Sequence, residues 1–172
     1  MARVQQAAVF LDRDGVLNVD TGYPHLIEHF QPIPGAVEAV ATLNALGYRV
    51  IVVSNQSGVA RGYFSEDAVR DFNRHLQYYY AERGARIDAF YYCPFHPQAT
   101  IERYRCDHDE RKPRPGMIER ALKEHALDRA RSFMVGDKES DIQAAQAANI
   151  KGFLFENGNL WDFLRNTAVM FL

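Results

Sequence analysis

The sequence Ala7-Ala-Val-Phe-Leu-Asp-Arg-Asp-Gly-Val16 is the most informative stretch of the chain. Its apolar residues stop at two carboxylates, Asp12 and Asp14, that are separated by one residue. A short, continuously apolar run bounded by polar residues is typical of a strand buried on both faces of a parallel sheet. In such sheets ligands bind beyond the carboxyl ends of the strands. The stretch therefore predicts a buried first strand with candidate functional residues at its end.

The rest of the chain alternates between short apolar runs and amphipathic segments. We expect four more strands, at residues 49–53, 87–92, 132–135 and 152–155. Apolar spacing and capping residues predict helices between and after them, at residues 36–46, 66–83, 115–126, 139–148 and 160–166. This alternation indicates an α/β fold of three layers, Rossmann-like, with a central parallel sheet and helices on both faces. No insertion is large enough for a cap domain, so we expect one domain over residues 1–172, with an irregular loop at 93–110.

Composition narrows the class of protein. The chain has 172 residues, of which 47% are hydrophobic, and 22 acidic side chains against 20 basic ones give a formal net charge of −2. This balance argues against a broad nucleic-acid-binding face. Two cysteines cannot build a disulfide framework, and no apolar run approaches the roughly 18 residues of a membrane span. We expect a cytoplasmic monomer without nucleic-acid or membrane partners.

Asp12 and Asp14 are the first candidates for chemistry. Two carboxylates this close repel each other, and a set of oxygen ligands favours a hard cation such as Mg²⁺ between them. A carboxylate held beside a phosphate can attack phosphorus and form an aspartyl phosphate. The second carboxylate can give a proton to the leaving oxygen and then take one from water. The alternative is a solvated aspartate pair in a turn, and this motif alone does not choose between the two.

Three further motifs lie at strand ends or before a helix. Ser54 and Asn55 follow the second apolar run, where a hydroxyl and backbone N–H groups can bind phosphoryl oxygens. Lys112 precedes a predicted helix and can neutralise a phosphoryl group and the attacking carboxylate. Asp137, after the fourth strand, is a candidate metal ligand, and Asp141 lies one helical turn later, where it can support that ligand. Taken singly, each motif also fits an ordinary polar turn.

Together and in this order, these four motifs resemble the haloacid dehalogenase (HAD) superfamily of phosphohydrolases. The resemblance implies that Asp12 is the nucleophile and Asp14 the general acid and base. It implies Mg²⁺ bound by the Asp12 side chain, the Asp14 backbone carbonyl and Asp137. Ser54 and Lys112 would hold the phosphoryl group, which agrees with the dependence of phosphoryl transfer on positioning and charge neutralisation.

Longer stretches are similar to one branch of that superfamily, the small cap-less phosphatases of D-glycero-D-manno-heptose 1,7-bisphosphate, of which the histidinol-phosphate phosphatases are near relatives. These stretches are residues 10–15, 18–20, 22–23, 54–62, 91–94, 111–113, 115–117 and 135–138. By this resemblance Arg111 and Lys138 join substrate binding, and Asn55 positions the phosphate or the leaving group. The implied reaction removes one phosphate, the 7-phosphate, in heptose nucleotide synthesis for a surface polysaccharide such as lipopolysaccharide or capsule.

Two other functions stay open. The first is hydrolysis of histidinol phosphate or another small phosphate ester by the same residues. The second is a catalytically inactive HAD fold that binds a phosphorylated ligand or a protein. The presence of the whole set Asp12, Asp14, Lys112 and Asp137 argues against an inactive fold.

A metal site of a different kind is predicted in the irregular loop. Cys93, His96, Cys106 and His108 have the ligand types of a tetrahedral structural zinc site. By the same resemblance, related phosphatases bind zinc here through Cys-x-His followed by Cys-x-Cys. This chain has Phe95 at the first histidine position and His108 at the last cysteine position. Two outcomes are open: an adapted site that uses His96, or a lost site that leaves two ordinary cysteines.

Overall fold

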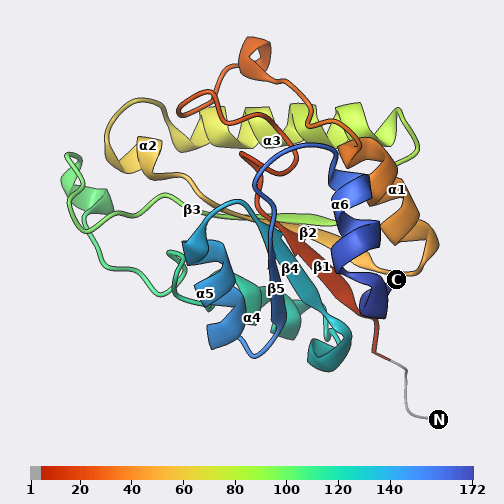
Figure 1. Ribbon diagram of the computed structural model, residues 1–172. Helices are drawn as coiled ribbons and strands as arrows, with labels where there is room; N and C mark the ends of the chain where they lie inside the picture. Colours follow the sequence, from red (N-terminus) through yellow and green to blue (C-terminus); the bar gives the residue numbers. More distant parts are fainter. Residues whose placement is uncertain (1–4) are drawn as a thin grey trace.

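The computed structural model describes residues 5–172, and it is built around a five-stranded parallel sheet (Figure 1). The strands lie in the order β3-β2-β1-β4-β5. Their bounds are β1 Ala8–Leu11, β2 Arg49–Asn55, β3 Ala89–Cys93, β4 Phe133–Gly136 and β5 Lys151–Leu154. The central strand is β1, which pairs with β2 on one side and with β4 on the other.

The register of the sheet brings the polar strand ends together. Leu11, the last residue of β1, is aligned with Val52 of β2 and with Val135 of β4. Asp12 follows β1 directly, and Asp137 follows β4 directly. Because the chain runs outward from β1 to β3 and then returns to β4 on the other side of β1, the strand order reverses between β1 and β4. Ligands of open α/β sheets bind at such a switch point.

Helices cover both faces of this sheet. One face carries α1 Ala36–Ala45, α3 Glu66–Ala81 and α6 Leu160–Thr167, and the other carries α4 Gly116–Glu124 and α5 Glu139–Ala147. In Figure 1, α1 and α6 lie side by side, and α4 and α5 lie on the opposite side of the strands. A short helix, α2 Ser57–Ala60, follows β2. The 3-10 helices are η1 Ile27–His29, η2 Glu102–Tyr104, η3 Arg129–Arg131 and η4 Val169–Phe171.

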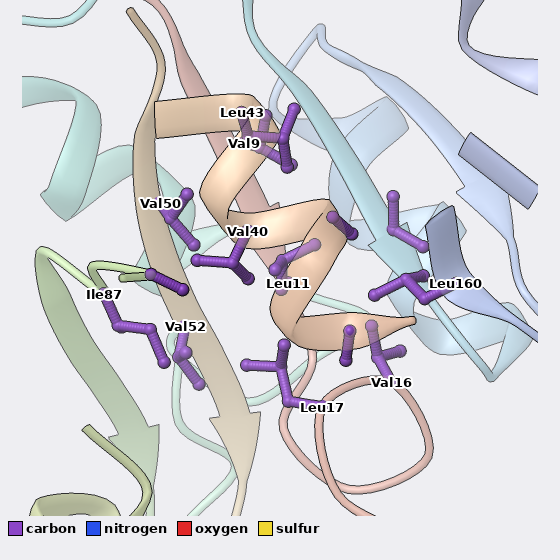
Figure 2. Packing of buried hydrophobic residues seen from close by; sticks show 14 of the residues in the cluster. Val9, Leu11, Val16, Leu17, Val40, Leu43, Val50, Val52, Ile87 and Leu160 are labelled. Atoms are coloured by element: carbon purple, nitrogen blue, oxygen red, sulfur yellow. The ribbon is translucent and has the colours of Figure 1, made fainter. Parts of the chain in front are cut away.

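Alternate side chains of β1 enter two different hydrophobic clusters. Val9 and Leu11 pack beneath α1, where Val40 and Leu43 meet them (Figure 2). Phe10 points to the opposite face and packs with residues of α4 and α5. Successive side chains of a strand point to opposite faces, so a strand covered on both sides must be apolar at every position. This explains why the first strand reads as a continuous apolar run.

The predicted α/β fold is confirmed, including the absence of a cap domain from the part of the chain that the structure describes. Every predicted strand and helix is present with bounds within two residues of those expected. Helix α2 was not predicted, because Ser57-Gly-Val-Ala60 is a single turn and too short to show a helical period. None of the helices within residues 5–172 has the length and apolar character needed to cross a membrane.

The packing of α1 on the sheet predicts how much stability is lost when a buried side chain of this helix is shortened. Leu43 is fully buried, whereas Leu46, at the end of the same helix, is 47% exposed. We expect Leu43→Ala to lower the free energy of unfolding by about 2–5 kcal/mol, since it removes buried methyl groups and leaves a void. Leu46→Ala, the matched control, should change it by less than about 0.5 kcal/mol. Urea unfolding followed by circular dichroism measures both, and equal losses would contradict the assigned packing.

Candidate active site

Asp12 lies at the end of β1 and is almost completely buried, with 6% of its surface exposed. Its Oδ1 lies 3.1 Å from Nζ of Lys112 and accepts a 2.8 Å hydrogen bond from the backbone N–H of Arg13. The buried Lys112 ammonium also lies 2.6 Å from Oδ1 of Asp141 and donates to the carbonyl of Val53 at 2.8 Å. These three contacts match the three donors of an ammonium. The lysine is therefore held beside Asp12 as a fixed positive charge.

The side-chain amide of Asn55 fixes the backbone of Lys112. Its Nδ2 donates to the carbonyl oxygen of Lys112 at 3.0 Å, and its Oδ1 accepts from the backbone N–H of Lys112 at 3.0 Å. This pair joins the end of β2 to the loop that precedes α4. Asn55 also lines the pocket, as expected, but its amide oxygen and one amide hydrogen are used to hold the lysine loop.

Burial and neighbouring charges determine the protonation of Asp12. Removal from water is the largest effect and raises the pKa of Asp12, whereas Lys112 lowers it. The carboxylates of Asp141, Asp137 and Asp14 raise it further, and the pKa of Asp12 lies at about 8. Burial also lowers the pKa of Lys112, but Asp12 and Asp141 outweigh that effect and the pKa of Lys112 is raised. Asp14 is paired with Arg13, but the single ammonium of Lys112 does not balance the three carboxylates of Asp12, Asp137 and Asp141.

Three of these carboxylates converge on one point. Asp12, Asp137 and Asp141 each offer an oxygen, and these oxygens all lie within 4.8 Å of one another. Oδ1 of Asp137 is buried and has no hydrogen-bond partner among the described residues. Gly15, at a φ of +91°, lies so close that a Cβ there would be 2.1 Å from Oδ2 of Asp137. An unpartnered carboxylate oxygen in a set of acidic oxygens fits a hard divalent cation.

The side chain of Asp141 belongs to the converging group, whereas that of Asp14 does not. The Asp14 side chain turns away from the converging oxygens and pairs with Arg13 at 2.9 Å. The resemblance implied the backbone carbonyl of Asp14, and not its side chain, as the metal ligand. Asp141 was expected in a supporting position, yet it is the third member of the carboxylate group. Gly136 permits this, because a Cβ there would lie 2.1 Å from Cβ of Asp141.

A pocket of about 550 Å³ opens over this group. Its lining includes the predicted site residues Asp12, Asp14, Ser54, Asn55, Arg111, Lys112 and Lys138. Arg111 is half-buried, and burial lowers the pKa of its guanidinium, as does the nearby Arg61. The Lys138 ammonium lies 3.4 Å from Oδ2 of Asp20. The structure therefore brings the predicted catalytic and substrate-binding residues to one cavity at the carboxyl edge of the sheet.

The predicted zinc ligands do not form a comparable group. Within residues 5–172, the acidic cluster described above is the one set of three or more histidine, cysteine or acidic side chains with converging ligand atoms. Cys93 is buried at the end of β3, Cys106 is exposed, and the ring of His108 stacks on Phe95 with centroids 4.5 Å apart. His96 Nδ1 accepts the backbone N–H of Gln98 at 3.0 Å. The geometry gives no support to the zinc site, which stays a prediction that metal analysis would test.

Two residues of the site were missed in the sequence. Gln56 is 4% exposed, and its Nε2 donates to Oγ of Ser54 at 2.7 Å and to Oδ2 of Asp14 at 3.2 Å. Arg13 is 1% exposed and holds Asp14 from behind. Arg13 lies between Asp12 and Asp14, and Gln56 follows Ser54 and Asn55, so both lie inside motifs whose other residues are the functional candidates. An arginine or glutamine in a polar turn is usually solvated, so only the burial of these side chains identifies them.

Comparison with known families agrees with this geometry. The family model described as haloacid dehalogenase-like hydrolase matches residues 9–77, and a second, described as HAD-hydrolase-like, matches residues 110–161. A D-glycero-beta-D-manno-heptose-1,7-bisphosphate 7-phosphatase from Pasteurella multocida is 50% identical over 144 residues, which cover 84% of this chain and 78% of the relative. The chain belongs to the haloacid dehalogenase-like hydrolases. It is a phosphoric monoester hydrolase of that family.

Two further comparisons cover nearly the whole chain. The 7-phosphatase of the same name from Rhodopseudomonas palustris is 44% identical and covers 96% of this chain and 92% of the relative. The crystal structure of D,D-heptose 1,7-bisphosphate phosphatase from B. bronchiseptica, complexed with magnesium and phosphate, superposes with a TM-score of 0.79 at 30% identity. It covers 93% of this chain and 86% of the other. The similarity therefore includes all four motifs and the loop between β3 and α4.

The buried ion pairs of Lys112 predict that loss of its ammonium strongly destabilises the fold. Lys112→Met leaves Asp12 and Asp141 buried without their positive partner, which should lower the free energy of unfolding by about 3–5 kcal/mol. Adding Asp141→Asn to that variant should recover part of the loss, because one unpaired charge is removed. Urea unfolding in a chelating buffer measures both. A neutral effect of Lys112→Met would mean that the ammonium does not carry the charge balance of the site.

Proposed function

We propose that this hydrolase removes the 7-phosphate from D-glycero-β-D-manno-heptose 1,7-bisphosphate, with Mg²⁺, in heptose nucleotide synthesis for a surface polysaccharide. The observation that carries the proposal is the carboxylate of Asp12, which faces a pocket while the buried ammonium of Lys112 lies 3.1 Å from it. The substrate is taken from the names of the similar phosphatases. Cytoplasmic location, a monomeric state and the absence of nucleic-acid or membrane partners stay predictions.

In the first step Asp12 acts as the nucleophile. Its carboxylate oxygen attacks phosphorus, the bond between phosphorus and the sugar oxygen breaks, and an aspartyl phosphate forms. Asp14 gives its proton to the departing sugar oxygen, which leaves as a hydroxyl. The hydroxyl of Ser54 would donate to the phosphoryl oxygens from the pocket wall, and Lys112 would neutralise them by its charge, since its three donors already have partners. Their fixed positions lower the cost of assembling charge during transfer.

In the second step the enzyme is restored. Asp14, now a carboxylate, takes a proton from water as the water oxygen attacks the same phosphorus. The bond between phosphorus and the Asp12 oxygen breaks, so inorganic phosphate leaves and Asp12 becomes a carboxylate again. Asp14 lines the pocket, with 15% of its side-chain surface exposed, which supports the proposed role in both proton transfers.

The residues present fit a divalent magnesium ion. Asp12 and Asp137 would bind it through their side chains and Asp14 through its backbone carbonyl, with Asp141 beside them. The unpartnered Oδ1 of Asp137 and the converging oxygens support this set. When bound, the ion would offset the negative charge of the carboxylates and the phosphoryl oxygens. The related B. bronchiseptica phosphatase was crystallised with magnesium and phosphate.

The outer part of the pocket would bind the sugar and the phosphate that is not cleaved. Arg111 and Lys138 both line the pocket, and each is a cation. Arg111 donates to the backbone carbonyl of Phe95 at 3.3 Å, and the salt bridge of Lys138 to Asp20 is long, at 3.4 Å. Both side chains therefore retain donors for an anionic ligand.

Replacing the nucleophile tests the covalent mechanism. Asp12→Asn keeps the shape of the side chain but removes its nucleophilic oxygen pair, so kcat should fall by at least about a thousandfold. Asp14→Asn should lower kcat by about a hundredfold or more and flatten the pH–rate profile, because the acid and base is lost. Continuous phosphate-release assays measure both. Near-normal turnover by Asp12→Asn would rule out the aspartyl phosphate.

A substrate panel separates the proposed function from the two other functions. Phosphate release is measured with both anomers of the heptose bisphosphate and with histidinol phosphate, each with Mg²⁺ or with a chelator. We expect turnover to be fastest with the β anomer and lost in chelator. A preference for histidinol phosphate would identify the small-ester alternative, and no turnover of any ester would favour a binding protein.

Titration with Mg²⁺ tests the metal-binding residues. Asp137→Asn should weaken Mg²⁺ binding by about tenfold or more, since a charged oxygen ligand is replaced by a neutral amide. Asp20→Asn is the matched control, because Asp20 lines the pocket outside the converging group and should leave binding nearly unchanged. Isothermal titration calorimetry measures both dissociation constants. Equal weakening by the two substitutions would mean that the pocket attracts the ion only by its overall charge.

A further inference from the structure

We propose that Arg13 is a positioning residue, which holds the carboxylate of Asp14 in the one orientation that serves proton transfer. The inference rests on the proposed function, which assigns proton transfer to Asp14. Arg13 itself is 1% exposed and does not line the pocket, whereas Asp14 does. Its effect on the reaction must therefore pass through another side chain.

The contact between the two residues is bidentate. Nε of Arg13 donates to Oδ1 of Asp14 at 3.0 Å, and Nη2 donates to Oδ2 at 2.9 Å. Two parallel hydrogen bonds from a planar guanidinium fix both the distance and the plane of a carboxylate. A lysine in the same place would supply a charge but a single point of contact. The geometry thus specifies the direction of the Asp14 oxygens as well as their charge.

The guanidinium is in turn held by its surroundings. Nη1 donates to Oδ1 of Asn73 at 2.9 Å, and Nη2 donates to the carbonyl of Pro24 at 3.0 Å. The ring of Phe72 lies against its flat side, with Cζ 4.4 Å from the ring centroid. Phe72 and Asn73 belong to α3. Helix α3 and the loop that carries Pro24 therefore fix the position of Arg13, and Arg13 in turn fixes the orientation of Asp14. All three guanidinium nitrogens have partners.

The other side-chain contacts of Asp14 are weaker. Gln56 donates to Oδ2 at 3.2 Å, and Asn18 donates to Oδ1 at 3.4 Å. These neutral amides fix the carboxylate less firmly than the charged, two-point contact of Arg13. Without Arg13 only these weaker contacts would orient the side chain of Asp14. A displacement of about 1 Å at a reacting group can cost roughly a hundredfold in rate.

The competing explanation is that Arg13 only stabilises the fold by joining the end of β1 to α3. A purely structural arginine would change stability, and its effect on kcat would be independent of the residue at position 14. A positioning residue has a different signature: its effect on kcat should vanish once Asp14 can no longer transfer a proton. Non-additivity of the two substitutions therefore separates the explanations.

The test is a double-substitution cycle on kcat and KM, with the β-anomer bisphosphate and saturating Mg²⁺. Arg13→Gln should lower kcat by about 10- to 100-fold and leave KM within about threefold, because Arg13 does not line the pocket. Arg13→Lys should retain more of kcat than Arg13→Gln does, because it keeps the charge. In the Asp14→Asn background, Arg13→Gln should change kcat by less than about twofold.

Arg129→Gln is the matched control. Arg129 also makes a two-point contact with a carboxylate, that of Glu119 at 2.6 and 2.7 Å, but it is not among the residues that line the pocket. It should lower the melting temperature and leave kcat unchanged. If Arg13→Gln fails to fold, the same cycle is run with Arg13→Lys, which preserves the buried charge and is expected to lower kcat with KM nearly unchanged.

Several outcomes would overturn the inference. These are a kcat within twofold of wild type in both Arg13 variants, losses that multiply with those of Asp14→Asn, or a rise in KM that accounts for the loss in kcat/KM. The proposed function fails separately, if Asp12→Asn keeps its turnover or Asp14→Asn has no effect. A dead Asp12→Asn and a slow Asp14→Asn, combined with a normal Arg13→Gln, would reject only the role of Arg13.

Discussion

A single buried ammonium organises the carboxyl edge of the sheet. Lys112 is surrounded by oxygen, with Asp12 at 3.1 Å, Asp141 at 2.6 Å and the carbonyl of Val53 at 2.8 Å. Buried charges are tolerated when they are paired and hydrogen-bonded, and these contacts meet both conditions. The balance is incomplete, however, because Asp137 adds negative charge to the same edge, whereas Asp14 is paired with Arg13. A site built in this way has a deficit of positive charge and an attraction for a divalent cation.

The rest of the molecule serves to bring those charged groups within reach of one another. The pairing of β1 with β4 places Asp12 near Asp137, because the two residues follow the ends of neighbouring strands. Gly15 and Gly136 remove the side chains that would otherwise fill the space beside Asp137 and Asp141. The two hydrogen bonds of the Asn55 amide to the backbone of Lys112 then join the end of β2 to the long irregular loop between β3 and α4.

That loop has no regular sheet or long helix to order it, and apolar packing does so in part. Phe95 stacks on His108 and lies near Tyr104, with ring centroids 4.5 and 5.9 Å apart. The hydroxyl of Tyr104 donates to Glu66 of α3 at 2.8 Å. Aromatic contacts of this kind add stability beyond the buried area itself. Phe95, which replaces a metal-binding residue type in the sequence pattern, is thus a packing residue in the structure.

The sequence alone was sufficient for the fold and for most of the site. Continuously apolar strands, helical spacing and the positions of Asp12, Ser54, Lys112 and Asp137 are local properties, and local properties can be read from residue order. It was not sufficient for Arg13, Gln56 and Asp141, whose importance depends on burial and on partners from distant segments. Nor did the sequence settle whether Cys93 and His96 lie close enough to Cys106 and His108 to bind a zinc ion together. Long-range contacts are decided by how the loops close over the sheet, so side-chain direction and burial emerge only when the chain is folded.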